Sequence, residues 1–160
     1  MTSAFRLVEI TTENVEDACR LSVRPDQRNL VQPVAQSLAL AYAFGERAWP
    51  RLVTDGEEIV GFLMAFVGVP FDADPPGVTR AGLWRLNVAA DHQGRGVGRF
   101  AVDRVAQELR RRGWGLLTTS WHVAENGPEP FYRRLGFRVT GELVEGEVVG
   151  ELDLGGGAPA

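Results

Sequence analysis

Three glycines lie within one six-residue stretch, residues 93–98, which reads Gln-Gly-Arg-Gly-Val-Gly. An extended apolar segment, residues 83–88, precedes the stretch, and a charged amphipathic segment that runs to about Arg112 follows it. A strand, a glycine turn and a helix N-terminus in this order present several backbone N–H groups to one anion. Because glycine has no Cβ, the backbone can approach a phosphate closely. The spacing therefore predicts a site for a phosphorylated cofactor.

Two familiar phosphate-binding motifs do not match this stretch. A Walker-type loop requires a lysine after its second glycine, and the chain contains no lysine at all. A dinucleotide fingerprint requires a third glycine at the position where Arg99 stands. The pattern that is left is Gln-x-x-Gly-x-Gly. Taken alone, it also fits a glycine-rich turn between a strand and a helix that binds nothing.

A second motif lies about thirty residues downstream, where residues 126–137 read Asn-Gly-Pro-Glu-Pro-Phe-Tyr-Arg-Arg-Leu-Gly-Phe. Asn126 is a favourable N-cap residue, and Gly136 suits the position just after a helix. The segment therefore predicts a short helix that carries Phe131 and Tyr132 and is followed by a strand. By itself, it also fits a capped surface helix with two aromatic side chains in the core.

Together and in this order, the two motifs resemble the signatures of the GNAT superfamily of N-acyltransferases, and the resemblance spans nearly the whole chain. It implies acetyl-CoA as co-substrate, with its diphosphate on the N–H groups from Gly94 to Arg99. It also implies that the pantetheine arm lies beside the end of the strand at residues 86–88. The cofactor-binding residues expected from the resemblance are Leu86, Asn87, Val88, Gln93, Gly94, Arg95, Gly96, Val97, Gly98, Arg99, Asn126, Phe131 and Arg134.

The implied reaction is direct attack of a primary amine on the thioester, and it raises two proton problems. An alkyl amine with a pKa near ~10.4 is mostly ammonium at neutral pH, so the site must lower that pKa or supply a base. The leaving thiolate departs more easily when it is protonated, and Tyr132 matches the tyrosine that serves this purpose in the family. Alternatively, Tyr132 is a core residue whose hydroxyl is satisfied within the fold. The sequence leaves the base open between a water relayed near Asn87 and a side chain such as His122.

The resemblance places the choice of acceptor in the first two helices, the loop between them and the last hairpin. Residues 14–42 and 83–86 are similar to the diamine and spermidine acetyltransferase branch, which predicts a small polyamine-like amine. Carboxylates and an aromatic ring can hold such a cation, although the carboxylates also fit an ordinary surface. The candidate acceptor residues are Asp26, Trp84, His122 and Glu142. The alternatives are a peptide or protein N-acetyltransferase, an aminoglycoside-type resistance enzyme and a non-catalytic acyl-CoA-binding module.

Composition and charge limit the domain count, the partners and the location that the sequence allows. The chain has 160 residues and a net charge of −4, which predicts one domain and argues against a nucleic-acid partner. Cys19 is the only cysteine, so it forms no internal disulfide, and we expect a small buried side chain. The spacing of the two histidines predicts no metal site. The sequence shows neither a signal peptide nor ~18 consecutive apolar residues, which predicts a cytoplasmic protein without a membrane partner. The resemblance also allows a homodimer.

Hydrophobic periodicity supplies the elements that must position these residues. Apolar side chains recur every four residues from Val97 to Leu109, which predicts a helix with one buried stripe. The order of elements predicts a single α/β domain over residues 1–154, with a GNAT-type mixed, mostly antiparallel sheet flanked by helices, and a disordered tail at 155–160. Strands are predicted at 5–9, 48–53, 59–67, 83–88, 116–121, 137–141 and 148–154, and helices at 14–23, 36–44, 97–112 and 126–135.

Overall fold

Seven strands form one sheet in the order β1-β2-β3-β4-β5-β7-β6. All neighbouring strands run antiparallel except β4 and β5, which are parallel. The computed structural model describes residues 4–155, so residues 156–160 of the predicted tail lie outside the described range. The prediction of a mixed, mostly antiparallel sheet flanked by helices is confirmed.

The elements follow the predicted order along the chain. The strands are β1 (Phe5–Val8), β2 (Ala48–Asp55), β3 (Glu58–Val69), β4 (Arg80–Val88), β5 (Leu116–Trp121), β6 (Arg138–Val144) and β7 (Glu147–Asp153). The helices are α1 (Val15–Cys19), α2 (Val34–Phe44), α3 (Val97–Arg111) and α4 (Glu129–Arg134), with short 3-10 turns η1 (Pro25–Gln27), η2 (Gly45–Arg47) and η3 (Ala90–His92).

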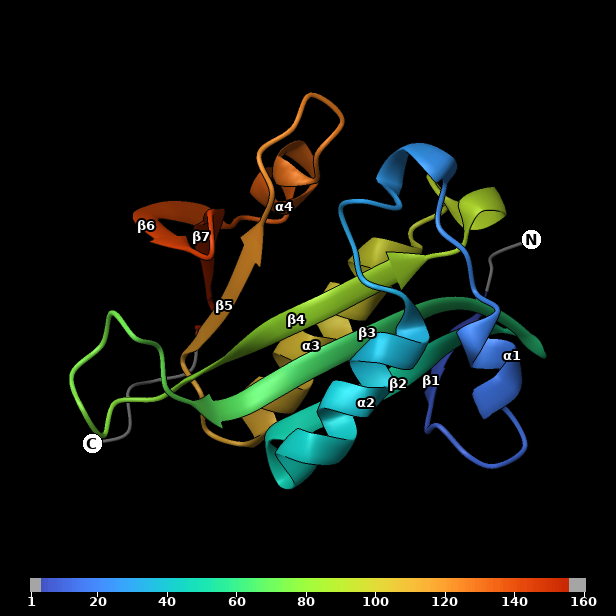
Figure 1. The fold of residues 1–160 in the computed structure, drawn as a ribbon, viewed down its shortest axis with the longest axis horizontal. Helices are drawn as coiled ribbons and strands as arrows, with labels where there is room; N and C mark the ends of the chain where they lie inside the picture. Colours follow the sequence, from blue (N-terminus) through green and yellow to red (C-terminus); the bar gives the residue numbers. More distant parts are fainter. Residues whose placement is uncertain (1–3, 156–160) are drawn as a thin grey trace.

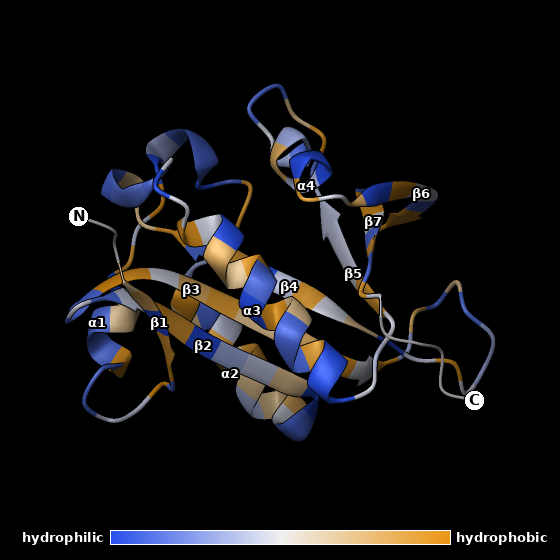
Figure 2. Cartoon of the chain, turned by 180° about the vertical axis from the view of Figure 1, so that it is seen from behind, coloured by the Kyte–Doolittle hydropathy of each residue, from blue (hydrophilic) through white to orange (hydrophobic). Residues whose placement is uncertain are grey.

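Helices cover both faces of the sheet (Figure 1). The α1 and α2 helices pack on one face over a cluster that includes Leu52, Phe62 and Met64. The α3 helix packs on the other face, and its predicted stripe from Val97 to Leu109 is buried. Seen from that side, α3 lies across the sheet and turns hydrophilic residues outward (Figure 2). The apolar spacing of α3 thus sets its orientation on the sheet.

The β4 and β5 strands pair over a short distance and then separate. Their register contains only the pairs Gly82–Thr118 and Leu83–Thr119. Figure 1 shows β5 turning away from β4 beyond this shared end, with α4 following it. The close approach depends on glycine, because a Cβ on Gly82 would lie 1.7 Å from the carbonyl oxygen of Thr118. The two strands therefore form a V that is closed at Gly82 and open toward Val88.

Two predictions from the sequence are wrong: Asn126 as the N-cap of α4, and the burial of Cys19. The α4 helix begins at Glu129 with Pro128 as its N-cap, so Asn126 does not cap it. The Asn126 amide instead donates a hydrogen bond to the backbone oxygen of Asp26, at 2.9 Å. Cys19 is exposed rather than buried, because the short α1 helix turns only its Ala18 side inward.

Candidate active site

A cleft of about 1400 Å³ opens between the two arms of the V. One wall is formed by the end of β4, the glycine loop and the start of α3, and the other by the end of β5, α4 and the β6–β7 turn. The residues predicted from sequence that line it are Trp84, Leu86, Val88, Gln93, Gly94, Gly96, Val97, Gly98, Arg99, His122, Asn126, Phe131, Tyr132 and Arg134. The structure thus brings most residues of the two motifs into one cleft, whereas Asp26, Asn87, Arg95 and Glu142 are not part of its lining.

The glycine loop leaves the N-terminus of α3 open. Gly94 and Gly96 have φ angles of 76° and 88°, in the left-handed region that glycine adopts readily. An added Cβ at either residue would meet nothing within 4 Å, so both face open space. Gly96 is the N-cap of α3, and no side chain in the described part of the chain caps the helix. Its first N–H groups are therefore available to an anion, which fits the diphosphate of acetyl-CoA.

Gln93 braces this loop through contacts within the protein. Its amide nitrogen donates to the side-chain oxygen of Gln27 at 2.5 Å and to the backbone oxygen of Val88 at 3.2 Å. The Gln27 amide donates back to the Gln93 oxygen at 3.1 Å. These bonds connect η1 to the glycine loop, and we assign Gln93 a positioning role. The sequence motif did not indicate its partner, because the two residues are 66 positions apart.

The free edge of β4 forms the floor of the cleft. Leu86 and Asn87 pair with β3 on one side, and within residues 4–155 no strand pairs with them on the other. Such an edge offers N–H and C=O groups to an extended diamide, as the pantetheine arm requires. The Asn87 side chain is directed elsewhere: it is 3% exposed and donates to the backbone oxygen of Gln32 at 2.9 Å. We therefore expect Asn87 to contact the cofactor through its backbone.

Tyr132 lines the cleft on its α4 side and is only 6% exposed. Its ring stacks on Trp121 at a centroid distance of 5.1 Å and meets Phe131 and Phe137 edge-on. Burial raises the pKa of the Tyr132 phenol to about 12, the Thr119 hydroxyl opposes this rise, and the charge of Glu147 adds to it. Since this pKa lies far above 7, the phenol keeps its proton at neutral pH and remains a hydrogen-bond donor.

His122, a candidate base and acceptor residue from the sequence, lies on the same arm beside two polar side chains that the sequence analysis did not name, Ser120 and Glu147. The carboxylate of Glu147 accepts a hydrogen bond from the Ser120 hydroxyl at 2.8 Å. Its other oxygen lies 3.3 Å from Nε2 of His122. All three residues line the cleft. Only the pairing of β7 with β5 brings Glu147 to this place, and no local motif around Glu147 indicates that pairing.

The two carboxylates predicted to hold the acceptor point to other partners. Asp26 pairs with Arg24 at 3.1 Å. Glu142 pairs with Arg80 at 2.7 Å, and Asp74 binds the same guanidinium at 2.7 Å. Hydrogen bonds from Arg24 and from Arg80 lower the pKa values of Asp26 and Glu142, respectively. Because these ion pairs lie outside the cleft lining, we remove Asp26 and Glu142 from the acceptor site.

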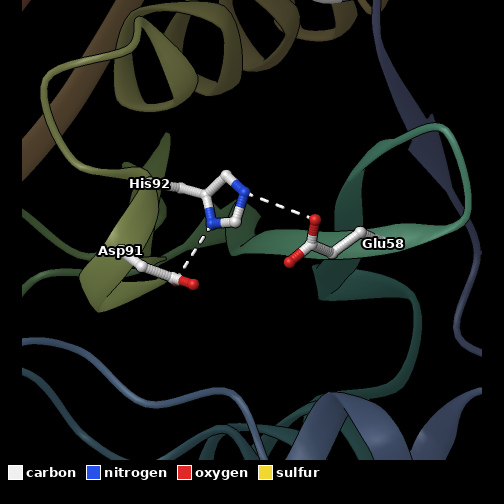
Figure 3. Close-up of side chains that lie close together, drawn as sticks. All are labelled: Glu58, Asp91 and His92. Atoms are coloured by element: carbon white, nitrogen blue, oxygen red, sulfur yellow. Dashed lines mark hydrogen bonds and ion pairs between the residues drawn. The ribbon is translucent and has the colours of Figure 1, made fainter.

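His92 lies between two carboxylates next to the glycine loop (Figure 3). Its Nδ1 is 3.0 Å from Asp91, and its Nε2 is 3.5 Å from Glu58. The two carboxylates therefore lie beside different nitrogens of the ring, and one ligand atom from each of the three residues lies within 4.8 Å of the other two. We interpret the group as a brace between the start of β3 and η3.

Comparison with known proteins identifies the chain's family. The model of the acetyltransferase (GNAT) family matches residues 13–137. The chain belongs to this family. The crystal structure of an acetyltransferase from Thermus thermophilus is similar, with 25% identity, a TM-score of 0.73 and coverage of 96% of this chain and 99% of that one. The PaiA N-acetyltransferase of Thermoplasma acidophilum, determined in complex with coenzyme A, shares the fold with a TM-score of 0.67 at 11% identity, over 94% and 99% of the two chains.

Among curated proteins, N-acetyltransferase 8 of Rattus norvegicus is 31% identical over 87 residues. The match covers 54% of this chain and 38% of that protein, so the chain spans well under half of this relative. These comparisons establish the GNAT family and fold and leave the acceptor to be argued from the site. Within residues 4–155, no helix has both the length and the apolar character needed to cross a membrane.

Proposed function

We propose that this GNAT protein transfers the acetyl group of acetyl-CoA to a primary amine of a small molecule by direct attack. The observation that carries the proposal is the position of Tyr132, a buried phenol on the cleft wall that keeps its proton at neutral pH. An acyl-CoA-binding module without activity has no need for such a donor. The uncapped start of α3 and the free edge of β4 support cofactor binding in the same cleft.

The reaction exchanges one bond for another. The amine nitrogen forms a bond to the acetyl carbonyl carbon, and the bond between that carbon and the CoA sulfur breaks. Tyr132 donates its proton to the departing sulfur, and solvent restores the phenol. The N–H groups at the start of α3 and along the β4 edge hold the cofactor, which places the thioester near the apex of the V.

The amine must lose a proton before or during attack, and we propose that His122 accepts it. An imidazole is the side chain suited to accept a proton near neutral pH, and Nε2 of His122 lies 3.3 Å from the carboxylate of Glu147, which fixes the ring in the cleft. Ser120 fixes the position of that carboxylate. His122 and Tyr132 then serve as the base and the acid from the same arm of the cleft.

The site supports a polyamine acceptor poorly. Of the acidic and aromatic residues expected to hold a polycation, Trp84 lines the cleft, but Asp26 and Glu142 do not. Arg85 also lines the cleft, beside Trp84, and its charge repels a polycation. We therefore propose a primary amine without additional positive charges. A homodimer, which the resemblance allows, stays a prediction that gel filtration can test.

A thiol-release assay tests the proposed function. Purified protein is given acetyl-CoA and a panel of amines that includes amino acids, aryl-alkyl amines, diamines and short peptides, and free CoA is followed over time. We expect release with small amines, and we expect Tyr132→Phe to lower turnover by about 100-fold, because general acid catalysis contributes about that much. The affinity for acetyl-CoA, measured by calorimetry, should stay within twofold. Wild-type turnover in the variant would assign the acid to another group, and the absence of CoA binding would refute the proposal.

A further inference from the structure

Arg85 is a partly buried cation on the cleft wall without an acidic partner. Its NH1 donates to the backbone oxygen of Trp84 at 3.0 Å, and its Nε is buried without any hydrogen-bond partner. No carboxylate in the described part of the chain lies within 4.0 Å of its guanidinium. Arg80, which lies on the same strand, contacts both Asp74 and Glu142. Both arginines are on β4, but only Arg80 is paired with carboxylates of the protein. The guanidinium of Arg85 is therefore available to a ligand in the cleft.

A guanidinium in this position favours an anionic ligand. Arginine stays charged in proteins, and a partly buried charge is unfavourable unless it is paired. Burial lowers the pKa of Arg85, and the charges of Glu147 and Glu145 on the opposite arm only partly oppose the shift. A carboxylate bound by two parallel N–H donors would supply the missing partner.

The other residues that line the cleft indicate the chemical character of the rest of such a ligand. The cleft that Arg85 lines is also lined by the aromatic rings of Trp84, its neighbour in β4, and of Phe66 and Phe71. Trp84 stacks on Phe66 at a centroid distance of 5.1 Å, so the rings form one apolar surface. The opposite arm carries the carboxylate of Glu147, which attracts an ammonium group. Positive and negative charges thus face each other across the cleft, with an apolar wall between them.

We propose that Arg85 binds a carboxylate of the acceptor, and that the acceptor is an amino acid with an apolar or aromatic side chain. Its ammonium group faces Glu147 and His122, its carboxylate pairs with Arg85, and its side chain packs on Trp84. The inference rests on the proposed function, since it names the acceptor for the same cleft. It excludes polyamines and peptide N-termini as preferred acceptors, because neither has a free carboxylate beside the reactive amine.

Three acceptors of nearly the same shape test this assignment: phenylalanine, phenylalanine amide and phenethylamine. We expect wild-type kcat/KM to be at least about 100-fold higher for phenylalanine than for the other two, because unpaired buried polar groups reject analogues that lack the matching group. Arg85→Gln should lower kcat/KM for phenylalanine by about 100-fold, mainly through KM, and leave kcat/KM for the two analogues without a carboxylate unchanged. The kcat/KM of Arg85→Lys for phenylalanine should lie between those of the wild type and Arg85→Gln, since lysine keeps the charge but loses the paired donors.

Arg51→Gln is the matched control, because it removes another partly buried arginine that lies outside the cleft lining. We expect this variant to show wild-type selectivity. Equal loss for all three acceptors in Arg85→Gln, or no loss for any, would overturn the assignment of Arg85. Efficient transfer by the wild type to diamines, peptides or phenethylamine would overturn the acceptor class but leave the acetyltransferase proposal intact. Failure to bind CoA would remove the proposed function itself.

Discussion

The two ends of the β4–β5 pair differ in almost every physical respect. At the closed end, Gly82 and Leu83 pair directly with Thr118 and Thr119, and all four residues are buried. At the open end, Leu86 is only partly buried and its edge has no partner strand among residues 4–155. The closed end is packed too tightly for a single added carbon at Gly82, whereas an added carbon at Gly94 or Gly96 would meet no atom within 4 Å.

This difference separates stability from function within one pair of strands. Unpaired backbone groups cost free energy when they are buried, so a protein keeps such an edge only where water or a ligand can satisfy it. The tight contact at Gly82 holds the two arms together, and the cleft begins where that contact ends. Substitutions at the closed end should therefore affect folding, and those at the open end should affect ligand binding and catalysis.

Gly82→Ala breaks the closed end and should have the largest effect. The new Cβ would lie 1.7 Å from the Thr118 carbonyl oxygen, which is backbone and cannot move aside cheaply. We expect a loss of at least about 3 kcal/mol in unfolding free energy, the upper range for overpacking, or a failure to fold. Chemical denaturation measures this. Gly115→Ala, just before β5 and with no atom within 4 Å of its Cβ, is the control and should be nearly neutral. A stable Gly82→Ala protein would show that the closed end does not hold the arms together.

Gly96→Val tests the open end. Its left-handed backbone costs about 1–2 kcal/mol for any residue with a Cβ, and the valine side chain would also cover the N–H groups at the start of α3. We expect CoA binding to fall at least about 100-fold by calorimetry, since the diphosphate loses those donors. Gly113→Val is matched to it, because Gly113 has the same kind of backbone, with φ of 90°, at the far end of α3. That control should lose similar stability and keep CoA affinity. Equal affinities in the two variants would disprove the phosphate-loop assignment.

Glu147→Gln removes only a charge at the open end. We expect it to change stability least of the three substitutions and to lower catalytic activity measurably. Glutamine can still accept the hydrogen bond from Ser120, whereas it removes the carboxylate charge that lies 3.3 Å from Nε2 of His122. We expect kcat/KM to fall about 10- to 100-fold, with stability unchanged, in a steady-state assay across pH. Glu145 supplies a second carboxylate on the cleft wall, so Glu145→Gln is the control. We expect its kcat/KM to fall less than threefold. Equal losses in both variants would indicate a general field effect instead of a role for Glu147.

Local patterns in the sequence predicted most of the fold. The stripe from Val97 to Leu109 predicted α3, and the bounds of β5 were predicted without error, because apolar periodicity reports which face is buried. Helix ends were less accurate. Asn126 has the right type for an N-cap, but its bond to Asp26 takes the amide away from α4. A residue 100 positions away decides that outcome, and no local propensity contains it.

The same distinction between local motifs and long-range contacts applies to the residues of the candidate site. The glycine loop and Tyr132 were predicted because each lies in a short motif. Arg85 and the hairpin that carries Glu147 were predicted only as parts of the acceptor region, without individual roles, because their importance depends on what faces them across the cleft. Glu142 looked suitable by type, yet Arg80 holds it elsewhere. The sequence therefore predicted candidate residues that belong to local motifs, and it gave no individual role to those whose position depends on long-range pairing of strands.

The η1 turn touches both arms of the V. Gln27 bonds to Gln93 after β4, and the backbone of Asp26 accepts a bond from Asn126 after β5. The turn thus forms a crossbar over the mouth of the cleft, built from neutral amides that salt does not weaken. We expect a long, flexible cofactor to pass this crossbar on entering and on leaving. The rate of cofactor exchange, and with it the residence time of spent CoA, should then depend on two amide contacts that take no part in the proposed chemistry.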